Sequence, residues 1–139
     1  MSQNQRTQYA IGIDVGTKTG LAIYDRSKRT LVEVKTLKIH KALELVRLWH
    51  KEHQITVVVE DARQVKYKTD PVKAQGAGSV KRDSTIWADF LTDENIAHTM
   101  KRPSKALSKL NEEIFRKITR YEGKTSQHGR DASMLVFGL

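Results

Sequence analysis

The chain has 139 residues and no cysteine, and its formal net charge is +9 at pH 7. This length predicts one domain with a hydrophobic core, and the lack of cysteine excludes disulfides, cysteine-ligated zinc and a thiol nucleophile. The basic charge favours a polyanionic partner, with nucleic acid ahead of an anionic membrane surface because no basic amphipathic helix is present in the pattern.

The N-terminal segment shows no targeting signal. Residues 1–7 are polar and are expected to form a flexible N-terminus ahead of the domain. No apolar run approaches the roughly 20 residues that span a bilayer. These features favour a cytoplasmic protein without a membrane partner.

Three alternating stretches in the first forty residues predict strands. Residues 8–15 alternate apolar side chains with small or polar ones and end near Asp14, and residues 20–25 and 30–37 continue the same period of two. Short polar turns join the three stretches. The sequence therefore predicts an antiparallel meander.

The next segment changes from the period of a strand to that of a helix, and a further strand follows it. Residues 40–53 place apolar side chains at helical spacing, which predicts an amphipathic helix. Ile55–Val59 is a short apolar run rich in β-branched residues, and it ends at Glu60. A strand that follows a helical crossover is expected to lie parallel to the first strand of the sheet.

The rest of the chain predicts a long loop and then alternating elements. Residues 62–79 are basic and contain glycine, which predicts an extended connection. A helix is expected over 80–92, a short fifth strand over 96–100, and a basic turn over 101–105.

Two capped helices are expected at the end of the chain. Asn111 is a candidate N-cap for a helix that stops near Gly123, and Ser126 is a candidate cap for a last helix over 127–138. The complete order is β-β-β-α-β-α-β-α-α. The sequence thus predicts a single mixed α/β domain over residues 1–139.

Three carboxylates and one histidine form a candidate metal site. Asp14 ends the first expected strand and Glu60 ends the fourth, so both would emerge at one edge of the sheet. His128 precedes Asp131 by three residues and shares its helical face. Converging carboxylates repel one another unless they share a proton or bind a divalent cation. Oxygen ligands favour Mg²⁺ or Mn²⁺, and two such ions about 4 Å apart suit phosphodiester cleavage.

Each of these residues also has an ordinary structural interpretation. Asp14 could hydrogen-bond the backbone of a turn, and Glu60 could be a surface charge at a strand end. Asp131 could pair with a Lys or Arg, and His128 could be a capping or surface residue. Asp61 is the obvious substitute for Glu60, but its side chain would point to the opposite face of the sheet.

The segment Gly12–Thr17, with the sequence GIDVGT, resembles two known motifs. One is the phosphate loop of the actin-like and sugar-kinase ATPases. The other is the first motif of RNase H-like nucleases, especially the RuvC Holliday-junction resolvases and their YqgF relatives. The ATPases need two such domains and this chain holds one, so no nucleotide cofactor is expected.

Three later segments resemble motifs of the RuvC family. Val57–Glu60 is similar to its second-motif strand and glutamate, and Lys73–Gly78 is similar to its glutamine- and glycine-containing segment. His128–Ala132 resembles its closing motif, in which His or Asp precedes the last Asp by three. The resemblance covers about residues 8–139, and the compact form is similar to phage-borne members, whose location would be the host cytoplasm.

The resemblance to RuvC implies an RNase H-like fold. Its mixed five-stranded sheet would combine an antiparallel meander with parallel strands and be flanked by helices. It also implies a homodimer in which each subunit cuts one of two symmetric strands of a four-way DNA junction, in DNA recombination and repair. Asp14, Glu60, His128 and Asp131 would bind metal and catalyse the reaction, with two Mg²⁺ or Mn²⁺ ions per site.

The resemblance also implies a role for the helix after Gly78, which would pair with its mate across the dimer axis. Trp87 and Phe90 would either lie in that contact or belong to the core. In the family, an aromatic wedge often follows the second-motif glutamate, and here the nearest aromatic residue is Tyr67, which suits base stacking or a loop anchor. The candidate DNA contacts are Arg63, Lys66, Tyr67, Lys68, Lys73, Lys81, Arg82, Lys101, Arg102, Lys105, Lys124 and Arg130.

The sequence therefore favours a metal-dependent, structure-selective DNA endonuclease of the RuvC type. Two alternatives stay open. One is an RNA-processing nuclease similar to YqgF, although Glu60 with the His128 and Asp131 pair disfavours that branch. The other is a catalytically inactive nucleic-acid binding module of the same fold.

Overall fold

A computed structural model of the chain describes residues 7–64, 71–103 and 109–139, with the backbone alone for residues 64 and 71–77. Most of the N-terminus that was expected to be flexible, residues 1–6, lies outside this description. Thr7 is anchored, because its hydroxyl accepts a hydrogen bond from Arg26 Nη1 at 3.0 Å.

The five predicted strands form one mixed sheet with the order β3-β2-β1-β4-β5. The strands are β1 (Tyr9–Asp14), β2 (Lys18–Asp25), β3 (Thr30–Lys38), β4 (Ile55–Glu60) and β5 (Ala97–Lys101). The first three strands pair antiparallel, and β4 lies parallel to both β1 and β5. The predicted meander and the parallel crossover are both confirmed.

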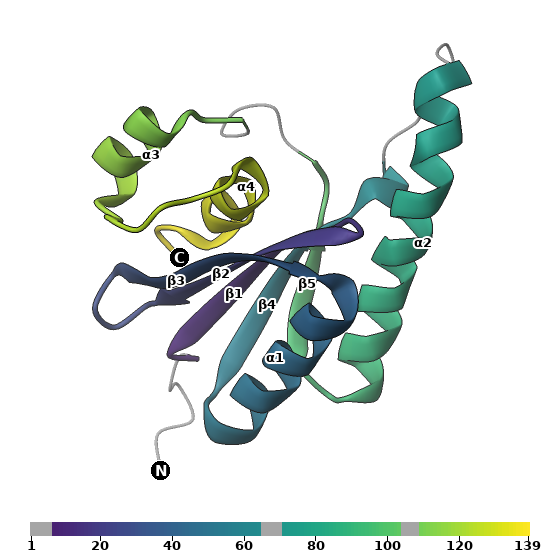
Figure 1. Cartoon of the computed structure of the whole chain (residues 1–139). Helices are drawn as coiled ribbons and strands as arrows, with labels where there is room; N and C mark the ends of the chain where they lie inside the picture. Colours follow the sequence, from purple (N-terminus) through teal and green to yellow (C-terminus); the bar gives the residue numbers. More distant parts are fainter. Residues whose placement is uncertain (1–6, 65–70, 104–108) are drawn as a thin grey trace.

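Helices cover both faces of the sheet, which gives three layers (Figure 1). The helices are α1 (Ile39–Glu52), α2 (Pro71–Asp93), α3 (Glu112–Thr119) and α4 (Gln127–Val136), with a short 3-10 turn, η1 (Ala62–Gln64). One hydrophobic cluster joins the sheet to α1 and α2, and a second cluster joins the opposite face to α3 and α4. No helix in these described ranges has the length and apolar character needed to cross a bilayer.

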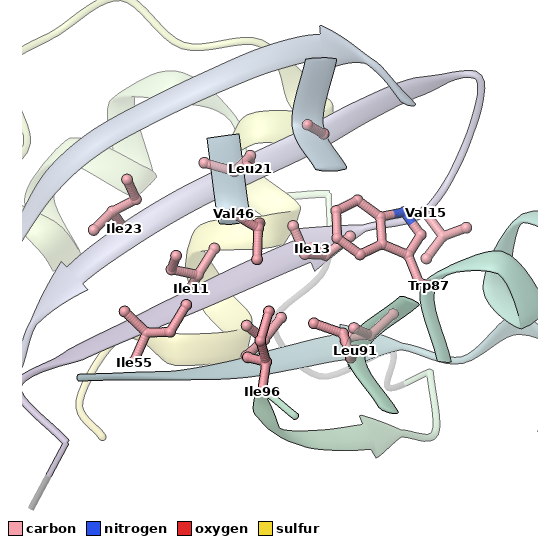
Figure 2. Packing of buried hydrophobic residues seen from close by; sticks show 13 residues of the cluster. Ile11, Ile13, Val15, Leu21, Ile23, Val46, Ile55, Trp87, Leu91 and Ile96 are labelled. Atoms are coloured by element: carbon pink, nitrogen blue, oxygen red, sulfur yellow. The ribbon is translucent and has the colours of Figure 1, made fainter. Parts of the chain in front are cut away.

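The alternation along β1 divides its side chains between the two clusters. Ile11, Ile13 and Val15 belong to the cluster under α1 and α2, where Trp87 also lies (Figure 2). Ala10 faces the other cluster, on the side of α4. Because side chains alternate between faces, Gly12 and Asp14 also belong to the α4 face.

Two glycines let α4 lie directly on the sheet. A Cβ atom at Gly12 would lie 2.0 Å from the carbonyl oxygen of Ala132, and a Cβ atom at Gly20 would lie 2.0 Å from that of His128. Atoms cannot approach so closely, so only glycine permits this contact. The N-terminal half of α4 is therefore held against the strand that ends in Asp14.

The second half of the chain corrects two predicted boundaries. Helix α2 begins at Pro71, so much of the loop expected over 62–79 is helical. Proline suits the first helical turn, and the buried side chains of Trp87 and Leu91 anchor the other end of the helix in the core. Trp87 is fully buried, which assigns it to the core rather than to a subunit contact.

Helix α3 also ends earlier than predicted, at Thr119 rather than near Gly123. Arg120 follows in the left-handed region with φ 61°, and its N–H donates to the carbonyl of Arg116. A non-glycine residue thus ends the helix in a conformation usually supplied by glycine. The predicted caps are confirmed, since Asn111 caps α3 and Ser126 caps α4.

The glycine contact predicts a large difference between two Gly→Ala substitutions. Gly12→Ala should lower the free energy of unfolding by at least about 1–3 kcal/mol, because the new Cβ must displace α4 from the sheet. Gly78→Ala is the matched control, because a Cβ there meets no atom within 4 Å and alanine favours the helix by about 1 kcal/mol. Urea denaturation of both variants checks this, and equal stabilities would contradict the close contact.

Candidate functional site

Asp14 and Glu60 stand side by side at the carboxyl ends of β1 and β4. The parallel register pairs Ile13 with Val59, so the next residue of each strand is a carboxylate. Neighbouring strands lie about 4.8 Å apart. Glu60 shares the parity of Val58, which belongs to the cluster under α4. Both carboxylates therefore lie at one edge of the sheet, as the sequence predicted, and on the face that α4 covers.

Helix α4 brings His128 to Asp14. Their atoms Nδ1 and Oδ2 lie 2.9 Å apart. An ionised carboxylate has no proton, so the imidazole must donate from Nδ1, and this fixes its neutral tautomer with Nε2 as an acceptor. The side chain of Asp14 is 16% exposed, whereas that of His128 is 53% exposed. His128 thus presents Nε2 toward solvent beside a largely buried carboxylate.

Asp131 is held by two hydrogen bonds to one of its oxygens. Its Oδ1 accepts from the side-chain amide of Gln127 at 2.9 Å and from the backbone N–H of Lys109 at 2.9 Å. Lys109 adopts a positive φ of 59°, a conformation that non-glycine residues rarely adopt. No hydrogen bond from the described residues reaches Oδ2, which leaves that oxygen available to a ligand.

The three carboxylates interact electrostatically. Burial raises the pKa of Asp14, and the charge of Asp131 adds to this effect, while the hydrogen bond from His128 opposes it. Burial also raises the pKa of Glu60, followed by the charges of Asp14 and Asp131, and Lys101 opposes the shift. The charge of Asp131 therefore disfavours the ionisation of Asp14, and the charges of Asp14 and Asp131 both disfavour the ionisation of Glu60.

The donor set fits an oxygen-preferring divalent cation. Three carboxylates and one imidazole nitrogen match the ligands of Mn²⁺ and Mg²⁺, and a cation would relieve the repulsion that raises the two pKa values. In the described parts of the chain, no three such side chains are grouped closely enough to hold an ion as they stand. At least one of these side chains would therefore have to move for all of them to bind one ion.

Two of the predicted DNA contacts are engaged within the protein. The guanidinium of Arg63 makes two hydrogen bonds to the carboxylate of Asp61, from Nε at 2.8 Å and from Nη2 at 3.0 Å. This pair raises the pKa of Arg63. Arg130 donates to the backbone carbonyls of Leu110 at 2.8 Å and Thr125 at 2.9 Å. Arg130 thus ties two loops to the start of α4, and DNA contact by either arginine stays a prediction.

The other basic candidates differ in how far the structure describes them. Lys101 ends β5 and pairs in register with Glu60, so it lies beside the carboxylates. The side chains of Arg82, Arg102 and Lys124 are exposed, and that of Lys81 is half-buried. Lys66, Tyr67, Lys68 and Lys105 lie outside the described residues, and the side chain of Lys73 is not described.

Three residues that lie near the candidate site in the structure are not predicted from the sequence. Gln127 holds Asp131 from one helical turn away, and its i,i+4 spacing was the available signal. Lys18 begins β2 and Lys38 ends β3, at the same edge as Asp14. Counting the hairpin register back from the turn at 26–29 would have paired Lys18 with Leu37, because a bulge between Ile23 and Tyr24 shifts the register by one residue.

Comparison with known proteins does not name a family. No model of a known protein family matches the chain, and no curated protein sequence matches it. The geometry of the site therefore carries the functional argument.

The crowded carboxylates predict that neutral substitutions stabilise the metal-free fold. A raised carboxyl pKa means that stability falls as pH rises from the unfolded pKa through the folded one, so the full penalty is present at pH 7. Asp14→Asn and Glu60→Gln should each raise Tm at pH 7 in EDTA by a few degrees. The Oδ1 atom of the new asparagine can still accept from His128.

The control for this measurement is Glu113→Gln, because Glu113 is exposed and pairs only with Lys117 among its described neighbours. That variant should leave Tm unchanged or slightly lower. Lower Tm values for the Asp14 and Glu60 variants would contradict the repulsion among the three carboxylates.

Arg130 provides a test that separates a structural role from phosphate binding. Arg130→Lys keeps the charge but loses the fork of donors that reaches two carbonyls. Its stability should fall by about 1–2 kcal/mol, while the salt dependence of DNA binding stays unchanged. Wild-type stability would contradict the structural role and would instead favour phosphate binding, which lysine also provides because it keeps the charge.

Proposed function

We propose that the chain is a divalent-metal-dependent endonuclease that cuts the phosphodiester backbone of branched DNA, with the four-way junction as the expected substrate. The observation that carries this proposal is the group of Asp14, Glu60 and Asp131 on one face of one sheet edge, with His128 hydrogen-bonded to Asp14. The chain as a whole carries a formal net charge of +9 at pH 7, which favours a polyanionic substrate.

The three carboxylates would hold the ions, expected to be two of Mg²⁺ or Mn²⁺. Bound there, the ions would activate water and neutralise the charge that develops on the phosphate. Asp14 is the least mobile ligand, because it is largely buried and bonded to His128. Asp131 is fixed through Oδ1 by Gln127 and offers Oδ2. The side chain of Glu60 has no hydrogen bond to any described residue, so it is free to complete the ligand set.

His128 would orient the attacking water or accept its proton. Its Nδ1 proton is committed to Asp14, which leaves the lone pair of Nε2 directed away from that carboxylate. An imidazole in this tautomer accepts a proton at Nε2, and the ionised Asp14 stabilises the resulting cation.

The arrangement of the sheet supports the choice of reaction. A meander of three strands followed by two parallel strands, with carboxylates at the ends of β1 and β4, is the layout expected of an RNase H-like nuclease. The resemblance of Gly12–Thr17, Val57–Glu60 and His128–Ala132 to RuvC motifs adds the branched DNA and the homodimer. These two features rest on the resemblance.

The test is cleavage of a synthetic four-way DNA junction in Mg²⁺. The wild-type protein should nick the junction, and EDTA should stop the reaction. Asp14→Asn and Glu60→Gln should each lower the rate more than about 100-fold, because loss of a direct ligand exceeds the 10- to 100-fold cost of losing a second-shell partner. Both variants should still bind the junction.

Asp93→Asn serves as the control, because it removes one exposed carboxylate at the C-terminal end of α2. The chain continues from there to the start of β5, at the edge of the sheet opposite Glu60. It should cut at the wild-type rate. Junction binding without cleavage by the wild-type protein would identify a binding module, and preferential cutting of RNA offered alongside would identify an RNA-processing nuclease. Either result would overturn the proposal.

A further inference from the structure

Lysines flank the carboxylates on both sides of the sheet edge. Lys18 and Lys38 are direct partners in the antiparallel register of β2 and β3. On the other side, Lys101 of β5 is the register partner of Glu60. In the order of the strands in the sheet, β3-β2-β1-β4-β5, the residues at this edge are Lys38, Lys18, Asp14, Glu60 and Lys101.

The lysine pair lies on the same face as the candidate site. Gly20 pairs with Asp14, and its missing side chain is where α4 touches the sheet at His128. Lys18 is two residues from Gly20, so its side chain leaves the same face of β2. Directly paired residues share a face, which places Lys38 there too.

Nothing in the described structure compensates these two charges. Lys18 and Lys38 are exposed, and neither forms an ion pair with a described residue. Like charges directly opposite one another destabilise an antiparallel pair. Lys38 also precedes α1, whose first turn contains no acidic residue, and a cation is unfavourable at that end of a helix. Two local rules of stability are broken at one point, which is typical of a functional surface.

We propose that Lys18 and Lys38 bind the phosphodiester backbone of the strand that is cut, on the β2–β3 side of Asp14, while Lys101 binds it on the β5 side. This inference rests on the proposed nuclease function and adds to it the path of the substrate. The strand crosses the ends of the five strands, with the carboxylates at the centre of the path.

The dimensions and the charges suit this path. Four inter-strand spacings of about 4.8 Å make the row from Lys38 to Lys101 about 19 Å long, which accommodates several phosphates. The central carboxylates repel a polyanion, so cations on both sides are needed to hold it over them. Lysine presents a compact point charge rather than a planar fork. The row therefore holds the backbone irrespective of base sequence.

The test measures binding of a fluorescent four-way DNA junction in EDTA, between about 50 and 200 mM KCl. The double variant Lys18→Gln/Lys38→Gln should bind more weakly than wild type, by about fivefold to tenfold for each lysine. The slope of log affinity against log salt should become shallower by about 1.8, or about 0.9 for each lost phosphate contact. Lys18→Arg/Lys38→Arg should restore both values because it restores the charges.

The matched control is Lys28→Gln/Lys51→Gln, which removes the same charge from the opposite ends of the β2–β3 hairpin and α1. Its salt slope should stay that of wild type. Equal losses in the two double variants would overturn the lysine path while leaving a junction-cutting wild-type protein as proposed. A wild-type protein that neither binds nor cuts the junction would overturn the proposed function itself.

Discussion

The contact between the backbone of α4 and two glycines of the sheet determines the geometry of the candidate site. Gly12 and Gly20 let the carbonyls of Ala132 and His128 approach β1 and β2 more closely than any side chain would allow. Without this contact, α4 would stand farther from the sheet, and His128 would not reach Asp14. The hydrogen bond between those two side chains is therefore a consequence of backbone packing.

The hydrogen bonds around the start of α4 extend the same constraint to Asp131. Ser126 caps the helix and also bonds to the hydroxyl of Thr36 on β3. Arg130 fixes the segments before and after α3 through the carbonyls of Leu110 and Thr125. Gln127 then holds Asp131 by one oxygen. A rigid helix start of this kind presents side chains in a defined geometry, which a metal site requires.

Repulsion between like charges at this edge lowers the stability of the metal-free fold. Carboxylates crowd at the ends of β1 and β4, and lysines face one another at the ends of β2 and β3. Each group is unfavourable by itself, and each has a natural complement outside the chain. A divalent cation complements the carboxylates, and a phosphodiester backbone complements the lysines. Both complements belong to the reaction that we propose, the metal-dependent cleavage of nucleic acid.

Much of this arrangement could be predicted from the sequence, because periodicity and strand order determine where strands end. The helical crossover between the first and fourth strands predicts that Asp14 and Glu60 lie at the same edge of the sheet. The spacing of three residues predicts that His128 and Asp131 share a face of the last helix. The sequence predicts a later start for helix α2 than the structure shows, because the glycines at 76 and 78 favour a loop. The packing of Trp87 and Leu91 in the core stabilises the helix despite these glycines.

Other features depend on contacts that no local pattern reveals. The donors of Arg130 are used by carbonyls about 5 and 20 positions away, so its basic character alone suggested a different role. The Lys18 and Lys38 pair required the hairpin register, which a bulge between Ile23 and Tyr24 shifts.

The central claim is that Asp14, Glu60 and Asp131 form one cation site, and the anomalous diffraction of a crystal soaked in Mn²⁺ tests it most directly. The account predicts an anomalous peak within coordination distance of oxygens from all three carboxylates, with His128 beside it. Mn²⁺ bound elsewhere, or absent from this edge at a concentration that supports cleavage, would contradict it.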